Sequence, residues 1–277
     1  MSLATSVLKF WCLAITFSAL PSCGSKLIRL GDQTAADSAG GSDAGGEAAG
    51  GTAGTPMVVG PGGDGGAAGS SEACPHRQVL ASEVLWIGDS WLTIPNGLQR
   101  ERVRKLALAA HAIDEGDDYV NLAAAATSMA AIAKQYDTRE NGATKVKVLL
   151  MDGGTWDPIA AQVAPGSSSA TVAAAIDNAI STFQNFLAKV ASDGTVEHIV
   201  YFLVPELPTI PGVATMRPRL QQTCTESTVR CHFIDLQPHW QGHPEYTAVD
   251  GIQASESGAT VIGDLIWATM QDHCIAQ

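Results

Sequence analysis

"VLWIGDSWLTIP", residues 84–95, places an apolar run directly before Gly-Asp-Ser and the start of a helical pattern. A continuous run of bulky apolar residues that ends at a glycine is typical of a strand buried on both faces. Ser90 then stands where the chain leaves this strand. Two interpretations follow: Ser90 is a nucleophile presented at a strand end, or it is a polar residue in an ordinary turn.

Apolar runs and helical patterns alternate along the rest of the chain. The expected strands cover residues 83–88, 119–122, 145–154, 197–207 and 229–236. The expected helices cover residues 96–113, 128–136, 169–192 and 257–271. Buried strands separated by helices predict an α/β fold, a three-layer α/β/α sandwich around a mostly parallel five-stranded sheet. The working residues of such folds lie at the carboxyl ends of the strands.

The first 72 residues are not expected to belong to this domain. Residues 1–23 hold a short apolar run that ends in "LPSC", which resembles a bacterial lipobox and predicts an export signal with a lipid anchor on Cys23. An ordinary signal peptide cut nearby is the alternative. Residues 24–72 are rich in Gly, Ala, Ser and Asp and predict a disordered tether. Residues 73–277 then form the α/β domain of an exported protein, either anchored in the cell envelope or secreted.

The cysteines agree with export. Cys74, Cys224, Cys231 and Cys274 are an even set in the expected domain, so we predict disulfides. Close spacing predicts the pair Cys224–Cys231, and the remaining two would join the domain ends. Metal binding is the weaker interpretation, because no Cys-x-x-Cys or His-x-x-x-His spacing accompanies them.

The charge limits the class of partner. A formal net charge of −12 argues against nucleic acid and against an anionic membrane surface. The membrane reached through a lipid on Cys23 stays an expected partner, and we expect the protein to be a monomer.

The motifs at the expected strand ends carry a family resemblance. "GDSW" follows the first strand, "DGGTWD" follows the third, and "DGIQASESGA" precedes the last helix. In this order they resemble the GDSL family of ester hydrolases, also called SGNH hydrolases, over roughly residues 84–271. The resemblance implies the flavodoxin-like SGNH hydrolase fold. It also implies a serine esterase that acts without a cofactor on an acyl ester or an O-acetylated sugar. The expected partner is therefore an ester, either small or linked to a polysaccharide.

The resemblance also assigns roles to single residues. It implies that Ser90 is the nucleophile and Asp250 the acid of its triad. Ala126 stands where the family has a Gly whose N–H binds the oxyanion, and Trp156 stands where it has an Asn that does so. Gly154, two residues before Trp156, is expected to line the same pocket. An indole N–H donates one hydrogen bond but reaches differently from a carboxamide, and an alignment shifted by one residue stays open.

The largest departure concerns the base. Gln253 stands three residues after Asp250, where the family has its catalytic His. A carboxamide cannot accept a proton near neutral pH, so Gln253 cannot be the general base. His243 is the first candidate to replace it and His239 the second, although either is equally an ordinary loop residue. The two hypotheses are a serine ester hydrolase with an atypical active site, and a catalytically inactive SGNH-fold module that binds a carbohydrate or an ester.

Two further groups have an ordinary explanation beside a functional one. Carboxylates at Asp89, Asp152 and Asp157 suggest metal binding or inverting hydrolysis, whereas an Asp in this motif generally caps the following turn. We expect no metal. The aromatic residues Trp91, Trp156 and Trp240 would lie at the mouth of the site and stack on a sugar or an apolar ester chain, or they are core residues.

Overall fold

The computed structural model describes residue 74 and residues 78–139 and 145–275. The predicted export signal, lipobox and tether lie outside these residues, so those assignments stay predictions. All described residues belong to one unit of the chain, Ala67–Gln277. Within them, no helix is long and apolar enough to cross a membrane.

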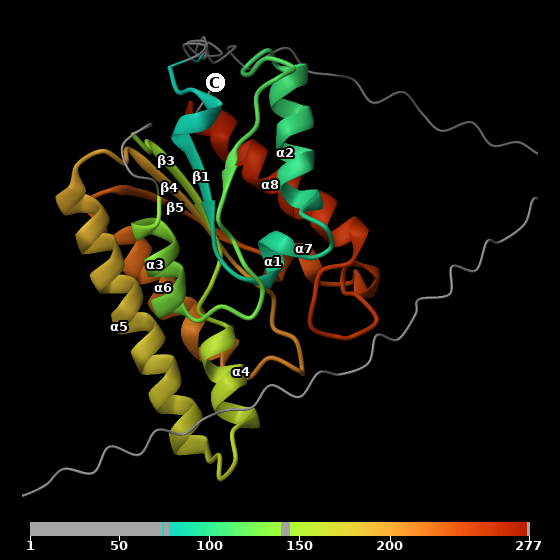
Figure 1. Ribbon diagram of the computed structural model, residues 1–277. Helices are drawn as coiled ribbons and strands as arrows, with labels where there is room; N and C mark the ends of the chain where they lie inside the picture. The colour runs from blue at the N-terminus through green and yellow to red at the C-terminus, as the bar shows by residue number, and fades with distance from the viewer. Residues whose placement is uncertain (1–73, 75–77, 140–144, 276–277) are drawn as a thin grey trace, which may run out of the picture. The chain divides into compact units, whose positions relative to one another are not determined.

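The centre of the domain is a five-stranded sheet in which every pair of neighbouring strands is parallel (Figure 1). The strands are β1 (Val84–Ile87), β2 (Val120–Asn121), β3 (Val148–Met151), β4 (His198–Leu203) and β5 (Arg230–Asp235), in the order β2-β1-β3-β4-β5. The three inner strands are buried along their whole length. The predicted α/β fold with a parallel sheet is confirmed.

The strands are shorter than the apolar runs that predicted them. The run at 145–154 contributes only Val148–Met151 to the sheet, because the next three residues leave the strand to build a turn. The pair at 120–121 is the shortest strand and lies at the edge, where one neighbour is enough to keep it in the sheet.

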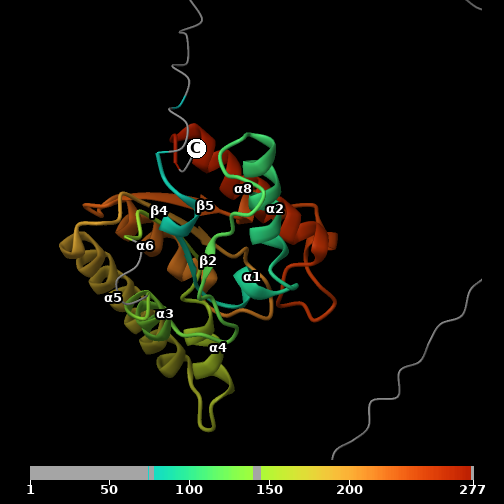
Figure 2. The same ribbon diagram turned by 45° about the horizontal axis from the view of Figure 1, so that its top comes forward.

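Helices cover both faces of the sheet. They are α1 (Ser90–Thr93), α2 (Leu98–Ala109), α3 (Met129–Asp137), α4 (Trp156–Val163), α5 (Ser169–Asp193), α6 (Val213–Thr225), α7 (Gln237–Trp240) and α8 (Glu256–Asp272), with short 3-10 turns η1 (Ala81–Glu83) and η2 (Pro244–Tyr246). Both views place α2 beside α8 on one face and α3 and α5 on the other (Figures 1 and 2). Helix α6 packs against α5 and β5.

Local sequence explains where the longest helix begins, ends and packs. The Ser168 hydroxyl accepts a hydrogen bond from the N–H of Thr171 at 3.2 Å and so caps α5, and Gly194 ends the helix in a left-handed conformation. Its buried side chains recur every three or four residues, which gives one apolar face for the sheet. These are Ile176, Ala179, Ile180, Phe183, Phe186, Leu187 and Val190.

The opposite layer depends on a close approach of α2 and α8. A Cβ on Gly263 of α8 would lie 2.7 Å from side-chain carbons of Arg102, so only glycine permits this spacing. The Arg102 guanidinium also donates to Asp264 at 2.7 Å. Helix α8 is therefore held to the helix that follows Ser90, and this contact brings the last sequence block to the first.

Three helices were not predicted. Helix α6 contains Pro218, which breaks its helical pattern in the sequence. Helix α4 lies after the expected strand 145–154, in residues to which no element was assigned, and α7 lies in the expected loop that carries His239. Both predicted disulfides are confirmed: Cys224–Cys231 joins the end of α6 to β5, and Cys74–Cys274 joins residues 200 positions apart.

Candidate active site

Ser90 lies at the carboxyl end of β1, as predicted. It is the first residue of α1, after the turn formed by Gly88 and Asp89, and is only 7% exposed. Ile87 pairs with Met151, so the segments that follow β1 and β3 leave the sheet side by side. The backbone therefore presents a serine hydroxyl at the carboxyl ends of the strands, where the active sites of α/β folds lie.

The turn before Ser90 fits closely around a buried carboxylate. The N–H of Asp89 donates to Asp152 Oδ1 at 2.6 Å. Gly88 has a φ of 150°, and a Cβ there would lie 1.9 Å from the same oxygen. Only glycine can combine this backbone conformation with this contact.

Asp89 does not cap α1 with its side chain, contrary to the expectation from the motif. Its Oδ1 instead accepts a hydrogen bond from the N–H of Thr127 at 2.9 Å, in the loop before α3. Because Asp89 directly precedes Ser90, this bond links the start of α1 to the loop that contains Ala126.

Three carboxyl groups in the segments that follow β1 and β3 are harder to ionise than usual. Burial, then the charge of Asp89, raises the pKa of Asp152 well above its usual range. Burial also raises the pKa of Asp89, against hydrogen bonds from the N–H groups of Thr127, Ser90 and Ala126. The pKa of Asp157 is raised by burial too, and its Oδ2 accepts the N–H of Met129 at 2.9 Å. Among the described residues, no group of three or more His, Cys, Asp or Glu could hold a metal ion.

Gln253 contacts the Ser90 hydroxyl. Its Nε2 donates to Ser90 Oγ at 3.2 Å, which confirms that the first and last sequence blocks meet. Its Oε1 is buried and has no hydrogen-bond partner in the described structure. The residue at the position of the family's base is thus in contact with the expected nucleophile, but it is a neutral amide.

Asp250 shapes the turn that presents Gln253. Its Oδ1 accepts the backbone N–H groups of Ile252 at 2.8 Å and Gln253 at 3.0 Å. No hydrogen bond joins the two side chains of Asp250 and Gln253 within the described residues. Asp250 therefore fixes the backbone here, and its predicted role as the triad acid stays a prediction.

His243 is oriented by a different carboxylate from the one expected. Its Nδ1 lies 2.8 Å from Glu245 Oε1, and its ring stacks on Tyr246 at 4.5 Å. The side chain is exposed, and in the described structure no hydrogen bond joins it to Ser90 or Asp250. Its predicted role as base is untested, but its partner is Glu245 rather than Asp250. His239, in α7, is also exposed.

The expected oxyanion positions differ in their surroundings. Ala126 has a φ of 57°, a left-handed conformation that glycine adopts more readily than alanine. Gly154 also has a positive φ, and its open side faces Met216 and Met129. Trp156 begins α4 and is half-buried, while Thr155, one residue earlier, is 4% exposed. Whether any of these groups contacts a substrate stays a prediction.

Two of the three tryptophans expected at the mouth belong to the core. Trp91 is 1% exposed and Trp240 is 8% exposed, and their rings lie 5.7 Å apart. Trp91 belongs to α1 and Trp240 to α7, and both rings are buried in the core rather than exposed to a ligand. Only Trp156 keeps an exposed part.

Sequence reasoning missed Gln135 of α3. Its carboxamide forms two hydrogen bonds with the backbone of Gly88, at 2.7 Å and 3.0 Å. No motif marked this residue, since a Gln on an amphipathic helix is usually exposed. The only signal is its place in the helix that follows the second strand.

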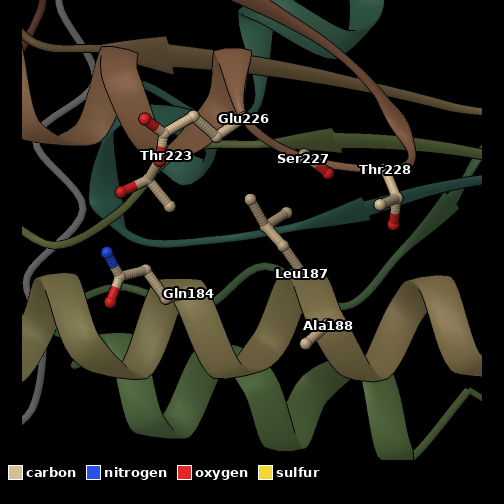
Figure 3. Close-up of a pocket in the computed structure, with 7 residues that line it drawn as sticks. All are labelled: Gln184, Leu187, Ala188, Thr223, Glu226, Ser227 and Thr228. Atoms are coloured by element: carbon tan, nitrogen blue, oxygen red, sulfur yellow. The ribbon is translucent and has the colours of Figure 1, made fainter.

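A cavity elsewhere in the domain has no connection with these residues. It measures about 280 Å³ and lies between α5 and the end of α6 (Figure 3). Its lining includes Gln184, Thr223 and Glu226, and no residue from the ends of β1 or β3.

No protein-family model and no curated protein matches the sequence. Solved structures do resemble the fold. LAE5, an α/β hydrolase from the metagenome of Lake Arreo, is 14% identical with a TM-score of 0.53, over 73% of this chain and 99% of that one. The acetylxylan esterase Axe2 from Geobacillus stearothermophilus, as a catalytic mutant, is 16% identical with a TM-score of 0.52, over 71% and 95%. TesA is 13% identical with a TM-score of 0.51, over 68% and 98%. At these identities the likeness is one of fold, and this chain has the α/β fold of SGNH-type esterases.

Proposed function

We propose that the protein is a serine ester hydrolase whose nucleophile is Ser90. One observation carries the proposal: a nearly buried serine hydroxyl stands at the carboxyl end of β1 and meets the last sequence block through Gln253. The surrounding contacts, from Asp152 to Asp89 and from Asp89 to Thr127, hold the turn that presents it. Such a fixed geometry is what nucleophilic catalysis requires.

The reaction needs a group that takes the proton of Ser90. Ser90 Oγ would attack the acyl carbonyl, the alcohol would leave with a proton, and water would then release the acid. Gln253 cannot take that proton, because an amide is not a base near neutral pH. The pair His243–Glu245 supports a role as base: if Nδ1–H donates to Glu245, Nε2 is left as a proton acceptor.

The acyl and alcohol groups follow from charge and from the structural neighbours. The chain carries a net charge of −12, and Asp250 and Glu245 are exposed in the last loop, so an anionic ester is disfavoured. Axe2 is named an acetylxylan esterase. We therefore propose a neutral acyl ester or an O-acetylated sugar as substrate, for an exported protein held in the cell envelope by a lipid on Cys23.

A second function is favoured by one contact. The hydrogen bond from Gln253 to Ser90 places an amide where an active enzyme of this type would need a base. A module that binds an ester or a carbohydrate without hydrolysing it would tolerate this arrangement. In that case Ser90 and Gln253 would contact the ligand as hydrogen-bonding groups.

One experiment separates the two functions. Purified wild type, Ser90→Ala and Gln253→His would be assayed with p-nitrophenyl acetate and with acetylated xylo-oligosaccharide. The hydrolase predicts turnover that Ser90→Ala abolishes and that Gln253→His does not improve. If wild type lacks Ser90-dependent turnover and Gln253→His creates it, the protein is a binding module built on a former active site.

A further inference from the structure

The side chain of Gln135 completes the hydrogen bonding of the backbone at the end of β1. The N–H of Gly88 donates to Gln135 Oε1 at 2.7 Å, and Gln135 Nε2 donates to the carbonyl of Gly88 at 3.0 Å. One carboxamide therefore bonds to both polar groups of one backbone residue. The two partners lie 47 positions apart in the sequence.

Gly88 needs this partner because β2 is too short to supply it. The ladder between β1 and β2 pairs only Leu85 and Trp86 with residues of β2. Past that point, Ala124 still donates its N–H to the Gly88 carbonyl at 3.0 Å, while the Gly88 N–H bonds to Gln135. A buried N–H without an acceptor is costly, so Gln135 stabilises the strand end that the sheet leaves incomplete.

The same carbonyl connects two parts of the candidate site. Gly88 lies two residues before Ser90, and Ala124 lies two residues before Ala126. The Gly88 carbonyl accepts from both Ala124 and Gln135, so the serine turn and the alanine loop share one anchor. A change at Gln135 would then move the hydroxyl and the expected oxyanion N–H together.

The helix that carries Gln135 is itself fixed at its start. Ser128 caps α3 by accepting the N–H of Ala131 at 3.3 Å. The N–H of Met129 donates to Asp157 at 2.9 Å. These bonds set where α3 begins, and Gln135 near its other end then reaches Gly88 from a rigid support.

We propose that Gln135 is a positioning residue for the reaction at Ser90. The proposal rests on the proposed ester hydrolysis. Gln135 does not contact the reacting atoms. It bonds to the backbone of Gly88, which leads to Ser90 and is hydrogen-bonded to the loop that contains Ala126. A carboxamide suits the role because it both donates and accepts, whereas an ionised carboxylate only accepts and a thioether offers one weak acceptor.

The test compares Gln135→Met and Gln135→Glu with wild type, and uses Gln184→Met as a matched control. Gln184 is an exposed helical Gln with no hydrogen bond in the described structure. For each variant we would measure kcat and KM with p-nitrophenyl acetate, Tm, and hydrogen exchange of the Gly88, Ser90 and Ala124 amides. Because a shift of about 1 Å can cost about 10²-fold in rate, Gln135→Met should lower kcat by about 10- to 100-fold with KM within twofold. Exchange at the three amides should become faster, and Gln184→Met should match wild type.

Gln135→Glu supplies a signature that loss of stability alone would not. Its carboxylate faces the Gly88 carbonyl when ionised, but once protonated it can donate and accept as the amide does. The ratio of its kcat to that of wild type should therefore rise as the pH is lowered from 8 to 5.

The outcomes are distinguishable from failure of the proposed function. If wild type has no Ser90-dependent turnover, the esterase proposal fails, and amide exchange alone decides the role of Gln135. Unchanged exchange in Gln135→Met, or a kcat within twofold of wild type, overturns the positioning role. If Gln135→Met does not fold, a flat pH ratio for Gln135→Glu overturns it equally.

Discussion

The Gln253 amide donates a hydrogen bond to the Ser90 hydroxyl over 3.2 Å and joins residues 163 positions apart. This contact places the last sequence block on the first, and it puts a group that cannot accept a proton beside the expected nucleophile. Any Ser90 chemistry must therefore draw its base from outside this pair.

The base prediction concerns His243. His243→Ala should lower kcat by about 10³-fold, since removal of a triad-type base leaves only a small part of catalysis. Tm should not change, because the ring is exposed and lies outside the core. Steady-state kinetics and thermal melts measure both. His239→Ala is the matched control and should behave as wild type, whereas full activity in His243→Ala would move the role of base to His239.

The second prediction concerns Gly88. Gly88→Ala should destabilise the domain by about 2–6 kcal/mol, because backbone strain and overpacking each cost about 1–3 kcal/mol. The new Cβ would lie 1.9 Å from Asp152 Oδ1, at a φ of 150°. Gly97→Ala is the control: its φ is 67°, nothing lies within 4 Å of a Cβ there, and it should cost only about 1–2 kcal/mol. Equal losses in urea unfolding would show that the carboxylate contact has no effect.

The disulfides should differ in their effect on stability. Cys74–Cys274 spans 200 residues and Cys224–Cys231 spans 7. On the chain-entropy model the long bridge stabilises by up to about 5 kcal/mol and the short one by about 2 kcal/mol. Double Cys→Ser variants of each pair, compared by urea unfolding, test the order. A larger loss from the short loop would contradict the entropic explanation.

The stability of the domain should depend on pH through two histidines, His198 of β4 and His232 of the edge strand β5. Arg230 only donates, so the 3.3 Å contact with His198 Nε2 leaves the His198 proton on Nδ1, which then donates to His232 Nε2 at 3.0 Å. Both imidazole rings are therefore neutral, and each accepts one hydrogen bond at its Nε2. Burial, then the charges of His273, His198 and Arg230, lowers the pKa of His232 to about 4.

The sign of the pH effect follows from linkage. An unfolded His binds its proton near pH 6.5, so between about 6.5 and 4 the unfolded state holds more protons than the folded one. His232 therefore lowers the free energy of unfolding progressively across that window as the pH falls, and its effect is constant above it. NMR titration should give a midpoint below 5. His232→Leu should make the free energy of unfolding less sensitive to acid. A titration midpoint of His232 near pH 6.5 would show that the hydrogen bonds from Arg230 through His198 do not keep this ring neutral.

Much of the fold could be read from the sequence. Apolar runs mark strands buried on both faces, and capping serines such as Ser168 mark helix starts, because these are local requirements of burial and hydrogen bonding. The strand-end position of Ser90 and the pair Cys224–Cys231 follow from the same kind of local rule. The pair Cys74–Cys274 was predicted as the two remaining cysteines, at the ends of the domain. Helix α6 was missed because Pro218 lowers helical propensity locally, while packing on β5 and α5 forms the helix anyway.

By itself, then, the sequence determined the α/β class, the position of Ser90 and the absence of a base at Gln253. The tertiary structure alone decided which polar groups meet. It brought Gln135 to Gly88 and Asp152 to Asp89, paired His243 with Glu245 rather than Asp250, and buried Trp91 and Trp240. The physical reason is that all of these contacts except the local pair His243–Glu245 join different elements, and they depend on the relative placement of those elements to within about an ångström, the tolerance of a hydrogen bond. Local patterns carry the period and the polarity of one element, but not that placement.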